Sequence, residues 1–455
     1  MEEMKLNFYY WVCVYPNQDK INEYYKNEMI ELSYNKYIDE AKQKGEYKYD
    51  LSIVIVGYNK LEYTKLCVEN VLKHVPKDLN YELILVNHGS TDGTKEYFES
   101  INPTKQLDIL KNGGGLYVIG RIVEGKYTLS ISNDVVVTEN AISNMLKCME
   151  SDEKVTYIVP TTPNVSNNQT IDANYSSMDE MHKFAAENNK QNSYRWEQRV
   201  RLCNPISMIR NDVCYSSEGI GFSRYYNTPS IQSFPDDIFS FIFRRNGYKM
   251  VLAKDAYCHH FGSVTLKDEI TEYNNSKSSE NTNFYLDGRK EFMKNFKIDP
   301  WGVGFCWDYD LIRHLNCNDT NKVNILGINC GLGSNPLKIK EDIKEKSHNL
   351  DVKVDNFTDE EKYVIDLESV SDFVKYVSSI YDIFGELGEN KYKYIVFESK
   401  IEKCTNPIET IKKLNLHLEV NGVFAVKIVD NSLRSKVSKI YEKAILSNEW
   451  IIIKE

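Results

Sequence analysis

An acidic residue follows a strand-like run in which apolar and hydroxyl side chains alternate. Residues 127–132 read Tyr-Thr-Leu-Ser-Ile-Ser and are followed directly by Asn133 and Asp134. A carboxylate in such a place can bind a hard divalent cation that bridges two phosphates. An aspartate after a strand is also a common turn or helix-capping residue. The pattern therefore indicates either a metal ligand or a structural cap.

Two further pairs of residues could take part in the same chemistry. Asp236 and Asp237 precede the helix-like run 238–245, where acidic residues interact well with the helix dipole. Either aspartate could instead act as a general base that removes a proton from a substrate. His259 and His260 follow the apolar run 249–253. A lone histidine is more often structural, but one beside a carboxylate-bound metal can be a further ligand.

The elements around these residues predict a parallel sheet. Apolar strands are expected over 51–56, 81–86 and 127–132, with helices over 61–74 and 94–101 between them. Alternating strands and helices form βαβ units, and ligands bind such sheets at the carboxyl ends of the strands. The residues expected on this rim are Gly57, Tyr58 and Asn59, then Asn87, His88, Gly89 and Ser90, then Asn133 and Asp134. Asp92 lies in the next turn, where a helix-capping role is the simpler interpretation.

Composition excludes several classes of function. The chain has 455 residues, of which 42% are apolar and 27% charged, as in an ordinary globular protein. Its net charge of −10 argues against a nucleic-acid partner and against adhesion to anionic membranes by charge alone. No apolar run reaches the roughly 18 residues of a membrane span. The ten cysteines include no C-x-x-C pair, which predicts reduced thiols and a cytoplasmic location.

Taken together, residues 51–265 resemble the GT-A glycosyltransferases of family 2. Each matching piece is short, but the order and spacing of the pieces follow the family. The pieces are Leu51-Ser-Ile-Val-Ile-Val-Gly-Tyr-Asn59, Leu85-Val-Asn-His-Gly-Ser-Thr-Asp-Gly-Thr94, Ile131-Ser-Asn-Asp-Val-Val-Val137, Phe234-Pro-Asp-Asp237, Gly247-Tyr-Lys-Met-Val-Leu252 and Ala256-Tyr-Cys-His-His-Phe-Gly-Ser263.

The resemblance implies a role for each matched position. Asp134 would ligate Mn²⁺ or Mg²⁺ at the donor pyrophosphate, with His260 or His259 as a further ligand. Asp236, with Asp237 as the alternative, would deprotonate the acceptor hydroxyl for in-line attack with inversion. The nucleotide sugar would be held by Gly57, Tyr58, Asn59, Asn87, His88, Gly89, Ser90, Asp92, Gly114, Asn133 and Asp134.

Some positions depart from the family pattern. Ser132 stands at the first acidic position of the D-x-D motif, so metal binding relies on one carboxylate. Asn87 stands where an aspartate is usual, and Pro235 stands where a glutamate is frequent. The arginine expected shortly after the run Asn112-Gly-Gly-Gly115 is not evident, and Arg121 is a weak candidate. The metal aspartate and the base are retained, which favours an active enzyme.

The last third of the chain resembles a different family. The run Ile325-Leu-Gly-Ile-Asn-Cys-Gly-Leu-Gly333 is similar to the first glycine-rich loop of S-adenosylmethionine-dependent methyltransferases. Segments 394–407 and 414–426 resemble other parts of the same fold. Gly327 replaces the acidic residue of that loop, and Asn329 replaces its first glycine. We therefore expect no S-adenosylmethionine here. A degenerate Rossmann-like module for dimerisation or acceptor docking is favoured over a methyltransferase.

The sequence thus predicts an α/β protein with a GT-A domain and a C-terminal Rossmann-like domain. The expected parts are a helical extension (1–48), the GT-A domain (49–265), a connecting helical segment (266–320) and the methyltransferase-like domain (321–455). The expected reaction transfers a sugar, with N-acetylglucosamine as one candidate, from a UDP-sugar to a hydroxyl acceptor. The acceptor is a protein such as flagellin or a glycan; the alternatives are a surface-polysaccharide glycosyltransferase, a non-catalytic scaffold and a methyltransferase.

Overall fold

The computed structural model describes residues 35–108, 115–220, 234–262, 264, 271 and 284–454. These residues divide into two compact units, which are described separately below. The first consists of residues up to 196 together with 202–291, and the second of residues 197–201 together with those from 292 onward. Each unit contains a sheet with α-helices, so the predicted α/β class is confirmed.

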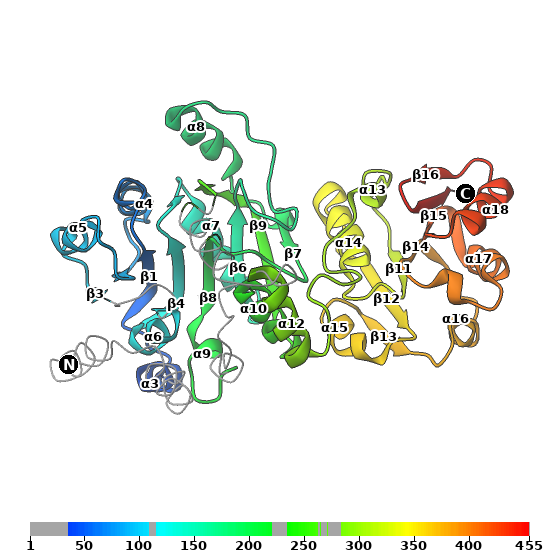
Figure 1. Cartoon of the computed structure of the whole chain (residues 1–455), viewed down its shortest axis with the longest axis horizontal. Helices are drawn as coiled ribbons and strands as arrows, with labels where there is room; N and C mark the ends of the chain where they lie inside the picture. The colour runs from blue at the N-terminus through cyan, green and yellow to red at the C-terminus, as the bar shows by residue number, and fades with distance from the viewer. Residues whose placement is uncertain are drawn as a thin grey trace. The chain divides into compact units, whose positions relative to one another are not determined.

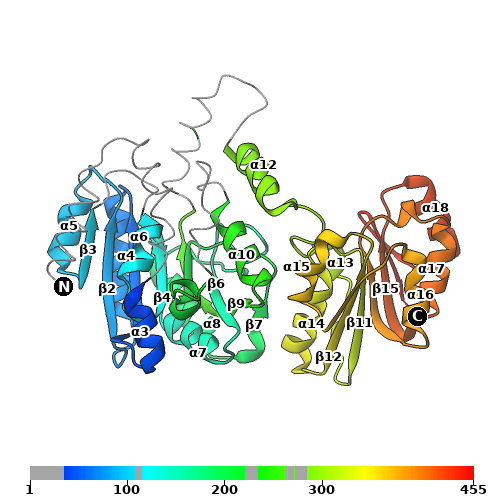
Figure 2. The same cartoon turned by 90° about the horizontal axis from the view of Figure 1, so that it is seen from below.

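An eight-stranded sheet organises the first unit, in the order β3-β2-β1-β4-β8-β6-β9-β7. Strands β1, β2, β3 and β4 are mutually parallel, and β8 runs antiparallel to β4 and β6. The strands lie side by side in Figure 2. Their bounds are β1 (Tyr49–Gly57), β2 (Tyr81–Asn87), β3 (Lys105–Asp108), β4 (Gly125–Ser132), β6 (Val155–Thr161), β7 (Trp196–Gln198), β8 (Ile206–Arg210) and β9 (Lys249–Tyr257).

Helices cover both faces of this sheet because the strands β1, β2 and β4 are apolar on both faces. On one face, side chains such as Ile53 and Ile55 pack against α4 (Leu61–His74), α5 (Thr94–Ile101) and α7 (Ala141–Glu150). On the other, Val54 and Ile84 pack against α6 (Gly115–Ile122). The strands and helices predicted near the start of this unit are therefore confirmed, with strand bounds that extend by one or two residues.

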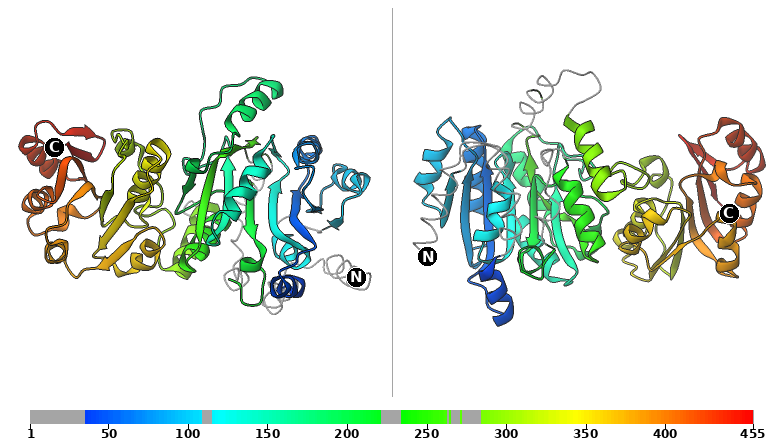
Figure 3. Two further views of the ribbon diagram at one scale, coloured as in Figure 1. Left: turned by 180° about the vertical axis from the view of Figure 1, so that it is seen from behind. Right: turned by 60° about the horizontal axis from the view of Figure 1, so that its bottom comes forward.

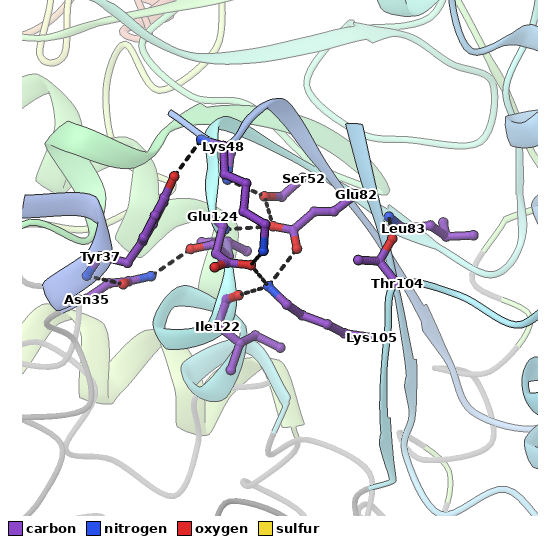
Figure 4. A network of polar contacts seen from close by, with 12 residues as sticks. Asn35, Tyr37, Lys48, Ser52, Glu82, Leu83, Thr104, Lys105, Ile122 and Glu124 are labelled. Atoms are coloured by element: carbon purple, nitrogen blue, oxygen red, sulfur yellow. Dashed lines mark hydrogen bonds and ion pairs between the residues drawn. The ribbon is translucent and has the colours of Figure 1, made fainter. Parts of the chain in front are cut away.

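A polar network ties together the amino ends of the strands. The Nζ atom of Lys105 lies 2.6 Å from Oε2 of Glu82 and 2.8 Å from Oε2 of Glu124. Glu82 is fully buried, and its Oε1 accepts a hydrogen bond from Ser52. Lys48 completes the network through Glu124, as Figure 4 shows. This cluster lies at the end of the sheet opposite the carboxyl edge.

One helix of the extension predicted over residues 1–48 lies in the described region. α3 spans Lys36–Lys44, and the residues before Asn35 lie outside the described part. The Asn35 side chain caps α3 by accepting hydrogen bonds from the N–H groups of Tyr37 and Ile38. Its amide group also donates to the carbonyls of Gly120 and Val123, which fastens the start of α3 to α6 and the residue that follows it.

A small second sheet and an insertion lie beside the main sheet. Two-residue strands β5 (Val135–Val136) and β10 (His259–His260) pair antiparallel. The insertion between β6 and β7 contains the helix α8 (Met178–Asn188), seen at the top of Figure 1 and of the left view of Figure 3. Met181 and Ala185 are buried on one face of this helix, which explains its order in a polar segment.

The second unit contains a seven-stranded sheet in the order β13-β12-β11-β14-β15-β17-β16. The first five of these strands are parallel, and β17 runs antiparallel to both neighbours. The bounds are β11 (Val323–Ile328), β12 (Val352–Thr358), β13 (Phe373–Tyr376), β14 (Tyr392–Phe397), β15 (Leu418–Lys427), β16 (Ile445–Ser447) and β17 (Trp450–Lys454).

Helices also cover both faces of the second sheet (Figure 2). One core contains α13 (Tyr309–Ile312) and α14 (Ser334–Ser347), and the other contains α16 (Ile383–Leu387), α17 (Pro407–Asn415) and α18 (Asn431–Ile440). Two further helices are α12 (Phe284–Phe296) and the short α15 (Val364–Glu368). In the part of the chain that the structure describes, no helix combines the length and apolarity needed to cross a bilayer.

Candidate active site

The carboxyl ends of three parallel strands meet at one edge of the first sheet. Gly57 of β1 is in register with Asn87 of β2, and Val56 is in register with Ser132 of β4. Backbone hydrogen bonds join the loops beyond these ends, from His88 to the Gly57 carbonyl and from Asn133 to the Val56 carbonyl. The predicted rim therefore exists, and it brings Gly57, Asn87 and Asn133 together.

Asp134 and His260 lie together beyond the end of β4. Atom Nε2 of His260 is 3.4 Å from Oδ2 of Asp134, and the Val264 N–H donates to the same oxygen at 3.2 Å. Burial raises the pKa of Asp134, but the hydrogen bond and charge of His260, with the Val264 N–H, outweigh it and hold the pKa below its ordinary value. An ionised carboxylate beside an imidazole nitrogen is a donor set that suits a divalent cation.

His259 points to a different environment from His260. Its Nδ1 atom lies 2.6 Å from the hydroxyl oxygen of Tyr175, and its ring meets Phe261 edge to face at 4.5 Å. Burial, and to a lesser degree His260, lowers the pKa of His259. The geometry thus brings His260, and not His259, to the Asp134 carboxylate.

The two loops predicted to hold a nucleotide are tied to each other. The Asn59 N–H donates to Oγ of Ser90 at 2.8 Å, and the Thr91 N–H donates to Oδ1 of Asn59 at 2.9 Å. Asn59 adopts a left-handed conformation with φ 53°, which asparagine tolerates better than most residues. Tyr58 and Gly89 lie partly exposed in the same pair of loops, whereas His88 is buried. The loops form one joined surface at the sheet edge.

Asp92 acts as a cap between two helices. Its Oδ2 accepts the Leu61 N–H at 2.8 Å, at the start of α4, and its Oδ1 accepts the Thr94 N–H and hydroxyl, at the start of α5. Burial raises the pKa of Asp92, but these hydrogen bonds outweigh it and lower the pKa overall. The capping interpretation of this residue is thereby supported, because its carboxylate oxygens are engaged by helix termini.

Asn87 is held by an acid that the sequence analysis missed. Its Nδ2 donates to Oδ1 of Asp108 at 3.0 Å, and its Oδ1 accepts the Ser90 N–H at 2.9 Å. Asp108 ends the short strand β3, next to β2 in the sheet. A carboxylate is therefore present beside the position where the family usually has one, on the neighbouring strand.

The Asn133 side chain is used within the protein. Its Nδ2 donates to the Asn59 carbonyl at 2.9 Å and to Oγ1 of Thr64 at 2.8 Å. It is 4% exposed. This arrangement links the end of β4 to the loop after β1, so Asn133 shapes the rim from behind.

The two candidate base residues open the helix α10 (Pro235–Arg245). Asp237 is 2% exposed, whereas Asp236 keeps part of its surface accessible. Tyr157 of β6 has a raised pKa, first because it is buried and second because of the negative charge of Asp236. Of the pair, Asp236 is the one that a substrate could contact directly. Gly114 lies outside the described residues.

Residues from the insertion after β6 also support the site, and the sequence analysis did not single them out. Asn164 donates from Nδ2 to the His260 carbonyl at 2.9 Å, and Tyr175 contacts His259. An aromatic residue in an otherwise polar stretch is the one signal that could have indicated Tyr175.

Cys67, on α4, supports the end of β4. Its thiol donates to the Ser132 carbonyl at 3.6 Å. Burial first, and the Asp134 charge second, raises the pKa of this thiol.

A cluster of carboxylates in the second unit is held by a lysine. Glu197, Asp342 and Glu345 are close enough to share an ion, and they are the one such group in the described ranges. The Nζ atom of Lys338, however, lies 3.0 Å from Glu197 and 2.6 Å from Asp342. The ammonium group already supplies the positive charge there, so this cluster is explained as a buried ion-pair network.

Comparisons with known proteins agree with this geometry in the first unit. Residues 52–215 match the model of Glycosyl transferase family 2. Glycosyltransferase GlyG of Streptococcus pneumoniae serotype 4 (strain ATCC BAA-334 / TIGR4) is 30% identical over 102 residues, which are 21% of this chain and 33% of that protein. The chain thus spans about a third of the length of the curated relative it matches.

Two solved structures are similar at low identity. GalNAc-T7 with UDP, GalNAc and Mn²⁺ gives a TM-score of 0.35 at 13% identity, over 47% of this chain and 44% of that chain. The mannosyltransferase PcManGT from Pyrobaculum calidifontis, in complex with GDP-Man and Mn²⁺, gives 0.34 at 13% identity, over 62% and 82%. Both TM-scores are too low to establish a common fold. The match to the Glycosyl transferase family 2 model covers residues 52–215, a segment that includes Gly57, Asn87 and Asp134.

Proposed function

We propose that the first unit is a metal-dependent, inverting glycosyltransferase of the GT-A type that uses a UDP-sugar. The observation that carries the proposal is the Asp134–His260 pair, 3.4 Å apart at the carboxyl edge of a parallel sheet, with Asp134 inside the residues that match the family 2 model. Nucleotide ligands bind such sheets at this edge. The S. pneumoniae relative is named a glycosyltransferase, which agrees with this reaction class.

Asp134 and His260 would hold Mn²⁺ or Mg²⁺. These residues suit a divalent cation because His260 Nε2 lies 3.4 Å from Asp134 Oδ2, and because the lowered pKa of Asp134 keeps its carboxylate ionised. A bound cation would neutralise charge that builds on the departing nucleoside diphosphate. The joined loops of Asn59 and Ser90, with Asn87 and its partner Asp108, would position the nucleoside. The same loops contain Gly57, Tyr58, His88 and Gly89. We also propose that Gly114 helps to hold the nucleotide sugar.

Asp236 would be the general base, with Asp237 as the alternative. In this step the Asp236 carboxylate accepts the proton of the acceptor hydroxyl. The acceptor oxygen then forms a bond to the anomeric carbon from the side opposite the leaving group. The bond between that carbon and the phosphate oxygen breaks, and the diphosphate leaves with the electron pair. Configuration at the anomeric carbon is inverted.

We propose an N-acetylhexosamine such as N-acetylglucosamine as the sugar. The proposed acceptor is a Ser or Thr hydroxyl of flagellin or another surface protein, because the two-domain architecture resembles glycosyltransferase and methyltransferase-like fusions that modify such proteins. A surface polysaccharide is the alternative acceptor. We propose a cytoplasmic location and self-association through the C-terminal unit.

We propose that the second unit is a methyltransferase-like domain that does not bind S-adenosylmethionine. Its strand order β13-β12-β11-β14-β15 is that of a doubly wound sheet, whose ligand crevice lies between β11 and β14. The segment 302–308, here called the strap, fills the place beside the glycine-rich loop. The N–H groups of Leu332 and Ser334 donate to the carbonyls of Val303 and Gly304.

The strap packs closely against the glycine-rich loop, and we propose that it leaves no room for a cofactor there. A Cβ atom on Gly331 would lie 1.9 Å from the Val303 carbonyl oxygen, and one on Gly304 would lie 2.0 Å from that of Cys330. The Asp308 N–H also donates to Oδ1 of Asn335, in the first turn of α14. Donors that would otherwise face a ligand are therefore engaged by the chain itself.

The proposed reaction is tested by measuring nucleoside diphosphate release from a panel of UDP-sugars and GDP-sugars with Mn²⁺, with and without EDTA. Turnover with at least one donor that EDTA abolishes is the expected result. Turnover that persists in EDTA, or a GDP-sugar as the preferred donor, would overturn the metal or the nucleotide assignment. If the protein is a non-catalytic scaffold, no donor will be hydrolysed or used for transfer. The same assay therefore distinguishes the scaffold hypothesis from the enzyme hypothesis.

A further inference from the structure

The strand that carries His260 is too short to hold itself in place. β10 consists of His259 and His260 only, and it pairs with the equally short β5. The Phe261 N–H, directly after β10, donates to the Asp134 carbonyl, and further restraints come from the insertion between β6 and β7. The Asn164 amide donates to the His260 carbonyl at 2.9 Å. A Cβ on Gly262 would lie 3.1 Å from the Cβ of Asn164, so the backbone after β10 is also packed against this residue.

Tyr175 restrains the other side of β10. Its hydroxyl oxygen lies 2.6 Å from Nδ1 of His259 and also hydrogen-bonds the hydroxyl of Tyr257. The rings of Tyr175 and His259 meet edge to face at 5.7 Å. Because neighbouring side chains of a strand point to opposite faces, a fixed His259 ring on one face fixes the direction of His260 on the other.

The insertion itself is anchored by apolar packing. Met181 and Ala185 of α8 are buried together with Val136 of β5 and Tyr257 of β9. Phe184 meets Tyr257 edge to face at 5.0 Å. Tyr175 is thus attached to a rigid cluster that includes the partner strand of β10, and it can transmit that rigidity to the histidine strand.

We propose that Tyr175 and Asn164 are positioning residues that aim His260 at the divalent cation of the Asp134 site. Tyr175 acts through the His259 ring, and Asn164 acts through the His260 carbonyl. The inference deepens the proposed function and rests on it, since it assigns a support to the proposed metal ligand. Partners of metal ligands typically change metal affinity 10- to 100-fold when they are removed.

The test measures Mn²⁺ affinity by calorimetry in the presence of saturating UDP. Tyr175→Phe removes only the hydroxyl, and we expect about tenfold weaker Mn²⁺ binding, with turnover restored by excess Mn²⁺. Tyr97→Phe is the matched control: its hydroxyl is buried on α5 without a described hydrogen bond, and its Mn²⁺ affinity should equal that of the wild type. Melting temperatures in EDTA show whether each variant is folded.

A second variant covers the case in which Tyr175→Phe is unstable. Asn164 has φ 57°, so Asn164→Gly keeps a permitted backbone while it removes the amide group. We expect the same loss of Mn²⁺ affinity from this variant. Wild-type Mn²⁺ affinity in folded Tyr175→Phe and Asn164→Gly would overturn the inference and leave the proposed function intact. Failure of the wild-type protein to bind Mn²⁺ with UDP would overturn the proposed metal site, and this inference with it.

Discussion

Nε2 of His260 lies 3.4 Å from Oδ2 of Asp134, although the two residues are 126 positions apart in the chain: Asp134 lies in the turn between β4 and β5, and His260 lies on β10. The antiparallel pairing of β5 with β10 brings them together, because His260 is opposite Val135, the residue after Asp134. A two-residue ladder thus joins the central part of the sheet to a late segment of the domain. The site depends on this pairing as much as on either side chain.

Replacement of Asp134 tests the metal site directly. Asp134→Asn keeps the size of the side chain and removes its charge, so we expect Mn²⁺-dependent UDP release to fall about 100-fold or more. Asp152→Asn is the control. It removes a carboxylate whose Oδ2 lies 2.7 Å from Nζ of Lys249, and this ion pair is not at the carboxyl edge of the sheet. Equal Mn²⁺ affinity in Asp134→Asn and wild type would contradict the assignment.

Replacement of the two α10 aspartates separates the base from its neighbour. Asp236→Asn should lower kcat by about 10²- to 10⁴-fold with little change in KM for the UDP-sugar. Asp237→Asn, at a position that is 2% exposed, should act on the melting temperature more than on kcat. If Asp237→Asn alone abolishes turnover in a folded protein, the roles of the two residues are exchanged.

Much of the site's framework could be predicted from local sequence patterns. The apolar runs around Ile53 and Leu83 identify β1 and β2, because strands buried on both faces carry few polar residues. The order of the motifs indicated Asp134 and His260. The choice between His259 and His260 needed the structure, since it depends on Tyr175, a residue more than 80 positions earlier in the chain.

Other features had no local signal. α8 lies in a polar stretch, and only the buried face with Met181 and Ala185 stabilises it. Asp108, beside Asn87, becomes visible only when β3 is placed next to β2. The strap of the second unit is likewise a tertiary contact between segments that have no shared periodicity. Pairings of this kind depend on chain packing, and a hydrophobic pattern does not reveal them.

The network at the amino ends of the strands gives a stability prediction that is independent of the site. Lys105→Met removes the cation that lies 2.6 Å from the fully buried Glu82. Loss of one partner of a buried ion pair costs about 3–5 kcal/mol of unfolding free energy. Urea unfolding measures this loss. Because Ser52, in this network, and Gly57 are separated by roughly 16 Å along β1, Mn²⁺ affinity at a temperature where the variant is folded should be unchanged.

Glu124 adds a pH dependence to the same network. Burial raises the pKa of Glu124, but Lys105 and Lys48 outweigh it, so the folded-state pKa lies below the ordinary value of 4.5. The stabilisation is therefore present above that ordinary value and is lost as the pH falls through the folded-state pKa. We expect the urea midpoint to fall on acidification from pH 7 to about pH 3, and to fall less in Glu124→Gln. The same pH dependence in both proteins would contradict this.

The second unit yields a binding prediction. Titration of S-adenosylmethionine into the full chain should release no heat at any concentration tested, because strap carbonyls occupy the Leu332 and Ser334 donors. Saturable heat would refute the proposal. Gly304→Ala should lower the melting temperature, since its Cβ would lie 2.0 Å from the Cys330 carbonyl oxygen. Gly385→Ala is the control: nothing lies within 4 Å of a Cβ there, and alanine favours the helix.

The strap also determines where the chain can be divided. A fragment that begins at residue 321, where the motifs place the start of the last domain, would contain every strand of the second sheet but lose Val303, Gly304 and Asp308. Its glycine-rich turn would be left with donors that have no acceptor from the chain. Residues 302–308 therefore belong with the second unit, whose continuous part begins at residue 292, and a cut at residue 321 would remove contacts on which the glycine-rich turn relies.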